Sequence, residues 1–333
     1  MNTNSSPTPE LAVSARGLVK TFGDLRAVDG IDLEVHRGEI FGVLGPNGAG
    51  KTTMLQMLAT LLPMDGGHAE IFGVDVQKHP HVVRQLVGVT GQYASVDENL
   101  TARENLFLFG RLLGLEKTKA RATGEDLLAR FGLEEAGDKQ IKEFSGGMRR
   151  RLDLAASLIS QPPLIFLDEP TTGLDPRTRG QMWDTIRDLV AQGSTILLTT
   201  QYLDEADQLA DRIAVIDHGR KVAEGTSDQL KSQVGSSTLQ LRLLDPAQTS
   251  QAVDVVRRVV GDEPVLTPEA GGINVPLADA NRAADVLIGL REQELLITSA
   301  TVSKPTLDEV FMALTGHGAG HAAEDETQKE LAR

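Results

Sequence analysis

The spacing of apolar residues predicts alternating strands and helices along the first 230 residues. Residues 31–35 alternate apolar and polar side chains, and residues 39–44 form a more continuous apolar run that ends in glycine. The next stretch carries an apolar stripe at helical spacing, which Pro63 ends, formed by Met54, Leu55, Met57, Leu58, Leu61 and Leu62. Residues 164–167 and 195–199 predict buried strands, and the residues between them predict a helix. Such alternation predicts an α/β fold with a parallel sheet covered by helices.

A different pattern begins near residue 236. Leu239, Leu241 and Leu243 alternate as in a half-buried strand, and a run of valines at helical spacing follows. The order strand, helix, strand, strand, helix, strand predicts a small α+β domain of the ferredoxin-like type, followed by a short helix over residues 307–314. We therefore expect a first domain at 11–230 and a second at 236–315. The polar ends, 1–10 and 316–333, are expected to be disordered.

Composition narrows the possible partners. The 333 residues suit two domains, and the formal net charge of -14 argues against nucleic acid, whose binders carry a basic face. The chain has no cysteine, so thiol chemistry is excluded. The first ten residues lack an apolar core, so we expect no signal peptide. The longest apolar runs are far shorter than the ~20 residues of a membrane helix, so any membrane role is expected to be peripheral, without direct insertion.

One segment matches the phosphate-binding loop pattern of Gly, four residues, then Gly-Lys-Thr: Gly45-Pro46-Asn47-Gly48-Ala49-Gly50-Lys51-Thr52. A predicted strand precedes it and a predicted helix follows, as the motif requires. Glycines let backbone N–H groups wrap the phosphates, and the helix N-terminus adds its positive end. We expect Lys51 to reach the β- and γ-phosphates of ATP, Thr52 to bind Mg²⁺, and Thr53 to line the same site. The alternative is a glycine-rich turn before an ordinary helix, which the matching context disfavours.

Two carboxylates end the predicted strand at 164–167. In a parallel sheet the carboxyl ends of the strands form the ligand-binding edge. We expect Asp168 in the Mg²⁺ shell and Glu169 as the general base that polarises the attacking water. Taken alone, an acidic loop after a strand is an equally good interpretation. The phosphate loop on the same predicted sheet favours the catalytic one.

A third motif separates this chain from kinases and small GTPases. Phe144-Ser145-Gly146-Gly147-Met148 precedes a predicted helix and lies just before the acidic strand. It resembles the signature of the ATP-binding-cassette (ABC) family, usually Leu-Ser-Gly-Gly-Gln, with Phe and Met at its ends here. Serine, glycines and a helix N-terminus suit an anion. The resemblance implies a phosphate-loop ATPase fold with a helical subdomain at about 93–160, and a signature that completes the ATP site of a second subunit.

Other residues fall where the family has functional positions. Gln92 matches the glutamine loop that touches Mg²⁺, Phe22 the aromatic ring that stacks on adenine, and residues 173–175 the loop that joins two subunits. The sequence leaves open whether Phe22 packs in the core and whether Asp175 only caps a helix. Gln201 stands where most members carry histidine. Its amide can hydrogen-bond the γ-phosphate without carrying charge, so we expect Gln201 to position that phosphate.

Within the family, residues 199–207 and 307–316 resemble the daunorubicin-resistance type of drug exporter. The resemblance implies an ATPase that works as a homodimer on the cytoplasmic face of the membrane, with a separate permease that exports a drug, antibiotic or lipid-like compound. Three alternatives stay open: an ABC ATPase acting on nucleic acid or ribosomes, a binding-only regulatory module, and an importer subunit. A single phosphate loop and acidic charge disfavour the first, Glu169 disfavours the second, and the C-terminal residues disfavour the third.

Overall fold

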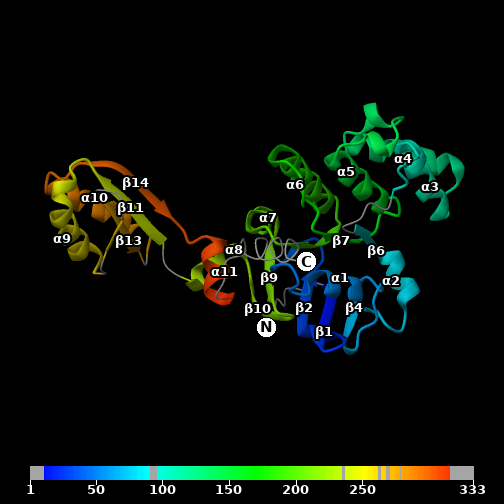
Figure 1. The fold of residues 1–333 in the computed structure, drawn as a ribbon, viewed down its shortest axis with the longest axis horizontal. Coiled ribbons are helices and arrows are strands. Elements are labelled where there is room, and N and C mark those ends of the chain that lie inside the picture. The colour runs from blue at the N-terminus through cyan, green and yellow to red at the C-terminus, as the bar shows by residue number, and fades with distance from the viewer. Residues whose placement is uncertain are drawn as a thin grey trace, which may run out of the picture. The chain divides into compact units, whose positions relative to one another are not determined.

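The chain forms two compact units that meet in sequence at Ser227 and Asp228. The computed structural model describes residues 11–90, 96–234, 237–261, 264–267, 271–277 and 279–315. Figure 1 labels the helices and strands of both units. Each unit is described by itself below.

A six-stranded sheet forms the centre of the first unit. Its order is β10-β9-β3-β8-β7-β6, and every neighbouring pair except β10 with β9 is parallel. The predicted parallel sheet is therefore confirmed, and the carboxyl ends of β3, β7 and β8 meet at one edge. The strands are β3 (Ile40–Leu44), β6 (Val87–Thr90), β7 (Leu164–Asp168), β8 (Thr195–Thr200), β9 (Arg212–Asp217) and β10 (Arg220–Gly225).

A separate antiparallel sheet of order β2-β1-β4-β5 packs with helix α1 (Lys51–Leu58) on one face of the central sheet. Residues 64–90, for which the sequence pattern predicted no element, supply β4, β5, β6 and α2 (Pro80–Leu86). The predicted extension of α1 to Leu62 is wrong. The helix ends at Leu58, Thr60 has a φ of 63°, and Leu61 is 63% exposed. The sheet consists of β1 (Leu11–Phe22), β2 (Leu25–His36), β4 (Gly66–Ile71) and β5 (Val74–Asp75).

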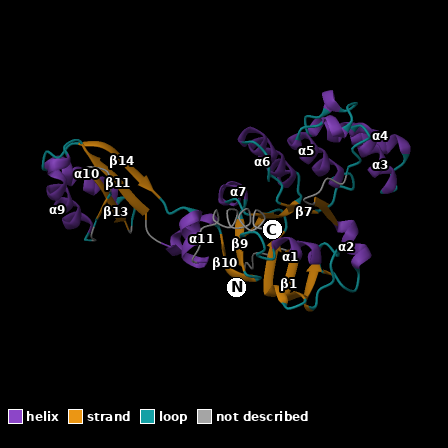
Figure 2. Ribbon diagram, viewed as in Figure 1, coloured by secondary structure: helices purple, strands orange, loops and turns teal. Residues whose placement is uncertain are grey.

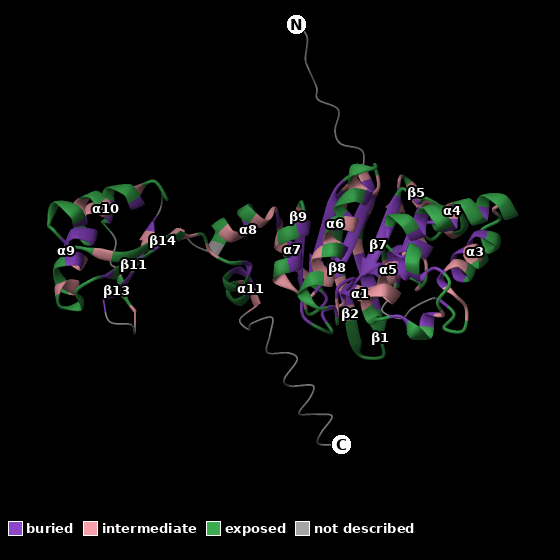
Figure 3. Ribbon diagram, turned by 90° about the horizontal axis from the view of Figure 1, so that it is seen from above, coloured by how far each residue is buried: buried purple, intermediate pink, exposed green. Residues whose placement is uncertain are grey.

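Helices cover the other face of the central sheet. Apolar residues of β7 and β8 pack there with a second core contributed by the helices, and Figure 3 shows both strands in the buried colour. Thr101 opens the first of these helices with a reciprocal pair of hydrogen bonds to Glu104, a capping box. Asp175 caps another. The helices are α3 (Ala102–Leu112), α4 (Lys117–Arg130), α5 (Gly146–Ser157), α6 (Pro176–Ala191) and α7 (Leu203–Leu209), with short 3₁₀ turns at Glu134–Ala136 and Ile141–Glu143.

The second unit contains the predicted ferredoxin-like arrangement. Its antiparallel sheet has the order β12-β13-β11-β14, and two helices, α9 and α10, pack their apolar faces against it (Figure 2). Helix α8 (Ser227–Val234) precedes this sheet, and the predicted last helix follows it as α11 (Leu307–Thr315). The other elements are β11 (Ser237–Leu243), a 3₁₀ turn at Pro246–Gln248, α9 (Thr249–Val260), β12 (Val265–Leu266), β13 (Gly272–Leu277), α10 (Arg282–Glu292) and β14 (Ile297–Ser303).

Candidate functional site

The glycine-rich loop joins β3 to α1 at the carboxyl edge of the central sheet. Gly50, at the N-cap of α1, has a φ of 101°, and a Cβ there would lie 2.2 Å from the carbonyl oxygen of Ala27. Only glycine therefore fits this position. Because glycine offers no side chain to cap the helix, the first backbone N–H groups of α1 receive no side-chain cap. A helix start of this kind suits an anion, and phosphate binding there stays a prediction.

Lys51 lies inside this loop and is almost completely buried. Its Nζ donates hydrogen bonds to the carbonyl oxygens of Gly45, at 2.8 Å, and Pro46, at 3.0 Å. The same Nζ lies 3.6 Å from Oε1 of Glu169. Burial lowers the pKa of Lys51, and the nearby charges of Glu169 and Asp168 oppose that effect. A phosphate that entered the loop would give this ammonium an anionic partner.

Asp168, at the end of β7, is buried and held by two hydroxyls. Thr52 Oγ1 donates to Asp168 Oδ1 at 3.0 Å, and Thr199 Oγ1 donates to the same oxygen at 2.5 Å. Hydroxyl and carboxylate oxygens are the ligands that Mg²⁺ prefers, together with substrate phosphates. The part of the chain that the structure describes holds no cluster of three or more His, Cys, Asp or Glu residues able to bind a metal. The donor set therefore fits an ion shared with a bound nucleotide.

Glu169 has a backbone conformation that non-glycine residues rarely adopt. Its φ is 49°, a strain of roughly 1–3 kcal/mol at such positions. Its N–H donates to Thr199 O at 3.1 Å and to Thr199 Oγ1 at 3.2 Å, and Thr172 Oγ1 donates to its Oε2 at 3.2 Å. The strained turn directs the carboxylate to the phosphate loop rather than into the sheet. Geometry of this kind suits a catalytic base.

These elements enclose one cavity of about 520 Å³. The predicted residues Phe22, Lys51, Thr52, Glu169 and Gln201 all line it, although they come from four separate segments of the chain. Phe22 is 48% exposed, so it is not a core residue. The remaining lining residues are Leu25, Ala27, Asn47, Gly48, Ala49, Gly50, Thr53 and Thr172.

The signature motif lies away from this cavity. Ser145 caps α5, its Oγ accepting from the Met148 N–H at 3.3 Å, and Gly147 packs closely against Thr178. Gly146 lines a separate hollow of about 200 Å³ with Gly173 and four other residues, and Thr172 lines both hollows. Figure 1 shows α5 beside α6, apart from α1. Within one chain, then, the signature does not reach the phosphate loop.

Two further predictions have different outcomes. Asp175 is a helix cap, as the sequence allowed: it accepts hydrogen bonds from the N–H groups of Arg177 and Thr178 and from the Thr178 hydroxyl, which lower its pKa. A role between subunits stays a prediction. Gln92 lies outside the described residues, so its predicted contact with Mg²⁺ also stays a prediction.

Sequence reasoning missed the threonines that organise the site. Thr199 bonds Asp168, and Thr172 bonds Glu169, yet neither was singled out. A signal was present, since Thr199 is the last residue of the strand predicted at 195–199. Only the strand register, which pairs Asp168 with Thr199, identifies the contact.

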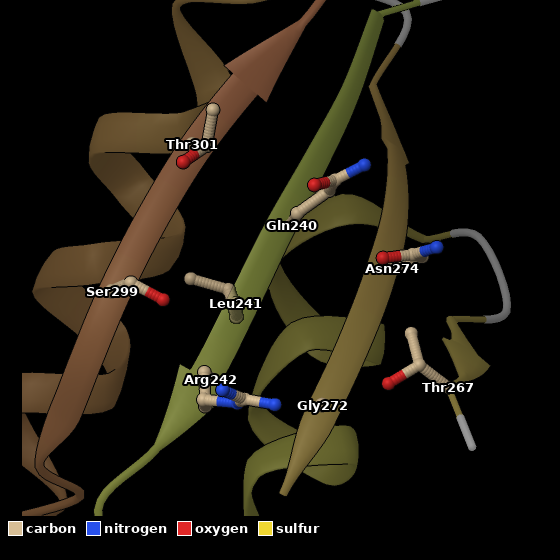
Figure 4. Close-up of a pocket in the computed structure, with 8 residues that line it drawn as sticks. All are labelled: Gln240, Leu241, Arg242, Thr267, Gly272, Asn274, Ser299 and Thr301. Atoms are coloured by element: carbon tan, nitrogen blue, oxygen red, sulfur yellow. The ribbon is translucent and has the colours of Figure 1, made fainter. Parts of the chain in front are cut away.

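A second hollow, of about 450 Å³, lies on the open face of the C-terminal sheet. Figure 4 shows its polar side chains on three neighbouring strands, β14, β11 and β13. Arg242 is the one charged residue among those that line it. None of the sequence motifs described above falls there.

Fold and site together define a nucleotide-binding protein of the phosphate-loop class. The ABC transporter family model matches residues 28–172. The chain is 50% identical over 327 residues to the daunorubicin/doxorubicin resistance ATP-binding protein DrrA of Streptomyces peucetius, covering 98% of both chains. It is 44% identical over 240 residues to the Nod factor export ATP-binding protein I of Burkholderia lata, covering 72% of this chain and 79% of that one.

Solved structures give the same assignment. A structure of an ATP-binding subunit of an ABC transporter superposes with a TM-score of 0.60 at 27% identity, covering 67% of this chain and 92% of that one. The chain therefore belongs to the ABC transporter family and is similar to its daunorubicin-resistance ATP-binding proteins over nearly its whole length. The resemblance stated from the motifs is confirmed. No helix in the described part of the chain is both long enough and apolar enough to cross a membrane.

Proposed function

We propose that this chain is the ATP-hydrolysing subunit of an exporter, and that two copies bind two ATP molecules between them. The observation that carries the proposal is the grouping of Lys51, Thr52, Asp168 and Glu169 at one sheet edge. The lysine supplies charge for the phosphates, the hydroxyl and Asp168 supply oxygen ligands, and Glu169 supplies a base. Each role needs the others within a few ångströms, as they are here.

ATP would bind with its triphosphate in the glycine loop and its base against Phe22. Backbone N–H groups of Gly48, Gly50 and α1 would donate hydrogen bonds to the phosphate oxygens. Thr52 and Asp168 would hold Mg²⁺, which neutralises phosphate charge when bound. Glu169 accepts a proton from the attacking water, and Gln201 donates a hydrogen bond to the γ-phosphate. Gln92 is assigned to the same ion by resemblance alone.

The position of the signature supports a second subunit. Ser145, Gly146 and Gly147 lie at the start of α5, which suits an anion, and they do not line the chain's own ATP cavity. In a head-to-tail pair, the signature of one copy would close the phosphate loop of the other. ATP then holds the pair together, and hydrolysis releases it. That cycle of closing and opening is the motion a transporter can use.

We further propose a separate integral-membrane permease as the partner, with this chain bound peripherally at the cytoplasmic face. Export of a drug or antibiotic is supported by the name of the Streptomyces relative. The Burkholderia relative is named for Nod factor, a different cargo. We therefore assign the choice of cargo to the permease rather than to this chain. Nucleic acid is not proposed as a partner, because the net charge is -14.

The test is Mg²⁺-dependent ATP hydrolysis by the purified chain over a range of protein concentrations. We expect the rate per molecule to rise with concentration, because the active site needs two chains. ATP binding without hydrolysis, even with the permease present, would contradict the proposal and favour the regulatory module. A rate per molecule that is independent of concentration down to fully monomeric protein would contradict the shared site.

A further inference from the structure

The position of Gln201 depends on the short helix that follows it. Only Gln201 and Tyr202 separate the end of β8 at Thr200 from the start of α7 at Leu203. A shift of α7 therefore moves Gln201 directly, since two residues cannot absorb it. Any contact that fixes α7 also fixes the side chain that faces the γ-phosphate in the proposed mechanism.

Glu205, in the first turn of α7, is fully buried and makes two such contacts. Its Oε1 accepts a hydrogen bond from Thr171 Oγ1 at 2.7 Å and one from Trp183 Nε1 at 3.3 Å. Thr171 lies two residues after Glu169, and Trp183 is on α6. One carboxylate oxygen thus connects the helix after Gln201 to the loop that carries the base and to a third segment.

A second contact connects α6 to the same turn. Arg179 lies one helical turn before Trp183, so both side chains are on one face of α6. Its guanidinium forms an ion pair with Asp204 at 3.1 Å and lies 4.9 Å from the ring centre of Tyr202. Arg179 and Trp183 together hold three of the four residues from 202 to 205.

Packing alone does not account for a carboxylate at position 205. Burying an acid costs stability even when it is hydrogen-bonded, and an apolar side chain of similar volume fills such a space at no such cost. What an apolar residue cannot do is accept hydrogen bonds from two different segments. The gain from Glu205 is therefore orientation rather than stability.

We propose that Glu205 is a positioning residue for ATP hydrolysis, holding Gln201 and Glu169 in fixed relation through α7 and Thr171. Glu205 is fully buried and does not line the ATP cavity. The proposal rests on the role assigned above to Gln201. Loss of Glu205 leaves the phosphate loop intact, so it lowers the rate of hydrolysis without changing the affinity for ATP.

The test compares two substitutions of similar volume. Glu205→Gln keeps an Oε1 acceptor, whereas Glu205→Leu fills the space and removes it. We expect Glu205→Leu to lower kcat by up to about 100-fold, as a small displacement of a reacting group can, with the Kd for ATP of the folded protein unchanged. Glu205→Gln should stay close to wild type. Wild-type kcat in Glu205→Leu, or a kcat that falls only in step with the folded fraction, would overturn the proposal.

A double-mutant cycle shows whether Glu205 acts through Gln201. We expect Glu205→Leu to slow Gln201→Ala by a smaller factor than it slows the wild type, and fully additive losses would overturn the proposal. If Glu205→Leu does not fold, Thr171→Val and Trp183→Phe each remove one donor to Glu205 Oε1 and should reproduce part of the loss. A different result would show that the role proposed for Gln201 is itself wrong. In that case Gln201→Ala would hydrolyse ATP at the wild-type rate.

Discussion

Lys51 and Glu169 face one another beside the phosphate loop, with 3.6 Å between Nζ and Oε1 and with both side chains buried. The pair places the cation proposed to bind phosphate beside the carboxylate proposed to accept a proton from the attacking water. Two charges so close and so poorly hydrated affect one another strongly. Removing the charge of Glu169 and removing the charge of Lys51 should therefore have different effects on ATP binding and hydrolysis.

Replacing Glu169 with glutamine should separate binding from hydrolysis. The amide keeps the size of the side chain but cannot accept a proton, so we expect kcat to fall by about 10²- to 10⁴-fold. The affinity for ATP should hold or increase, because a negative charge near the γ-phosphate is lost. Lys51→Ala is the contrasting variant and should lose ATP affinity itself. Equal loss of affinity in both variants would contradict these roles.

A substitution at Thr199 should change the affinity for Mg²⁺ rather than the affinity for ATP. Its hydroxyl donates to Asp168 at 2.5 Å, and such outer contacts of a ligand carboxylate typically change metal affinity by about 10- to 100-fold. Thr199→Val should raise the Mg²⁺ concentration needed for half-maximal hydrolysis. Thr199→Ser keeps the hydroxyl and is the matched control. An identical Mg²⁺ dependence in the valine and serine variants would show that this hydrogen bond has no such role.

Phe22 should contribute to binding of the adenine base and not to binding of the phosphates. The ring is half exposed and lines the cavity beside Leu25. Stacking of a base on an aromatic ring contributes about 1–3 kcal/mol, so Phe22→Ala should weaken ATP binding by about tenfold or more. Phe22→Tyr should retain it. Inorganic triphosphate should bind wild type and Phe22→Ala equally, and a parallel loss for triphosphate would point to a collapsed loop instead.

Glu205 should make stability depend on pH. Burial raises the pKa of this carboxyl above its ordinary value of 4.5, the hydrogen bonds from Thr200, Thr171 and Trp183 oppose the shift, and the charge of Asp204 adds to it. As pH rises above 4.5, the unfolded chain loses this proton before the folded chain does. The free energy of unfolding therefore falls until the pH passes the pKa of the folded state. Glu205→Gln has no such proton, so its free energy of unfolding should not fall for this reason. Urea unfolding at pH 5 to 8 should therefore show the glutamine variant gaining stability over wild type as pH increases. A constant difference would contradict the raised pKa.

The motifs predicted the central sheet and most of the ATP cavity because each has a fixed local context. A strand before Gly45 and a helix after Thr52 are part of the phosphate-loop pattern itself, and the order of elements after residue 236 sufficed for the ferredoxin-like topology. The antiparallel sheet could not be predicted in full, since β5 has two residues and β4 contains two glycines. The sequence predicted too long a helix α1, because Leu61 and Leu62 continue the apolar spacing. The backbone, however, leaves the helix at Thr60.

Contacts between distant segments explain what else was missed. The hydrogen bonds of Thr199 and Glu205 depend on strand register and on the packing of α6 against α7, whereas that of Thr172 depends on the strained backbone turn at Glu169. No spacing rule connects residue 171 with residue 205. The roles of individual residues in the cavity remain predictions, and the shared site is the central one.

The most direct measurement of that shared site is ATP-dependent dimerisation in a Glu169→Gln background, compared between Ser145→Asp and Ser145→Asn. Both substitutions keep a good helix cap on α5, but only aspartate places a negative charge at the proposed phosphate contact. Sedimentation with Mg²⁺ and ATP should show a dimer for Glu169→Gln and for the Ser145→Asn variant. The Ser145→Asp variant should remain monomeric and still bind ATP. A dimer that forms equally well with aspartate at this position, or no dimer in any variant, would contradict the account.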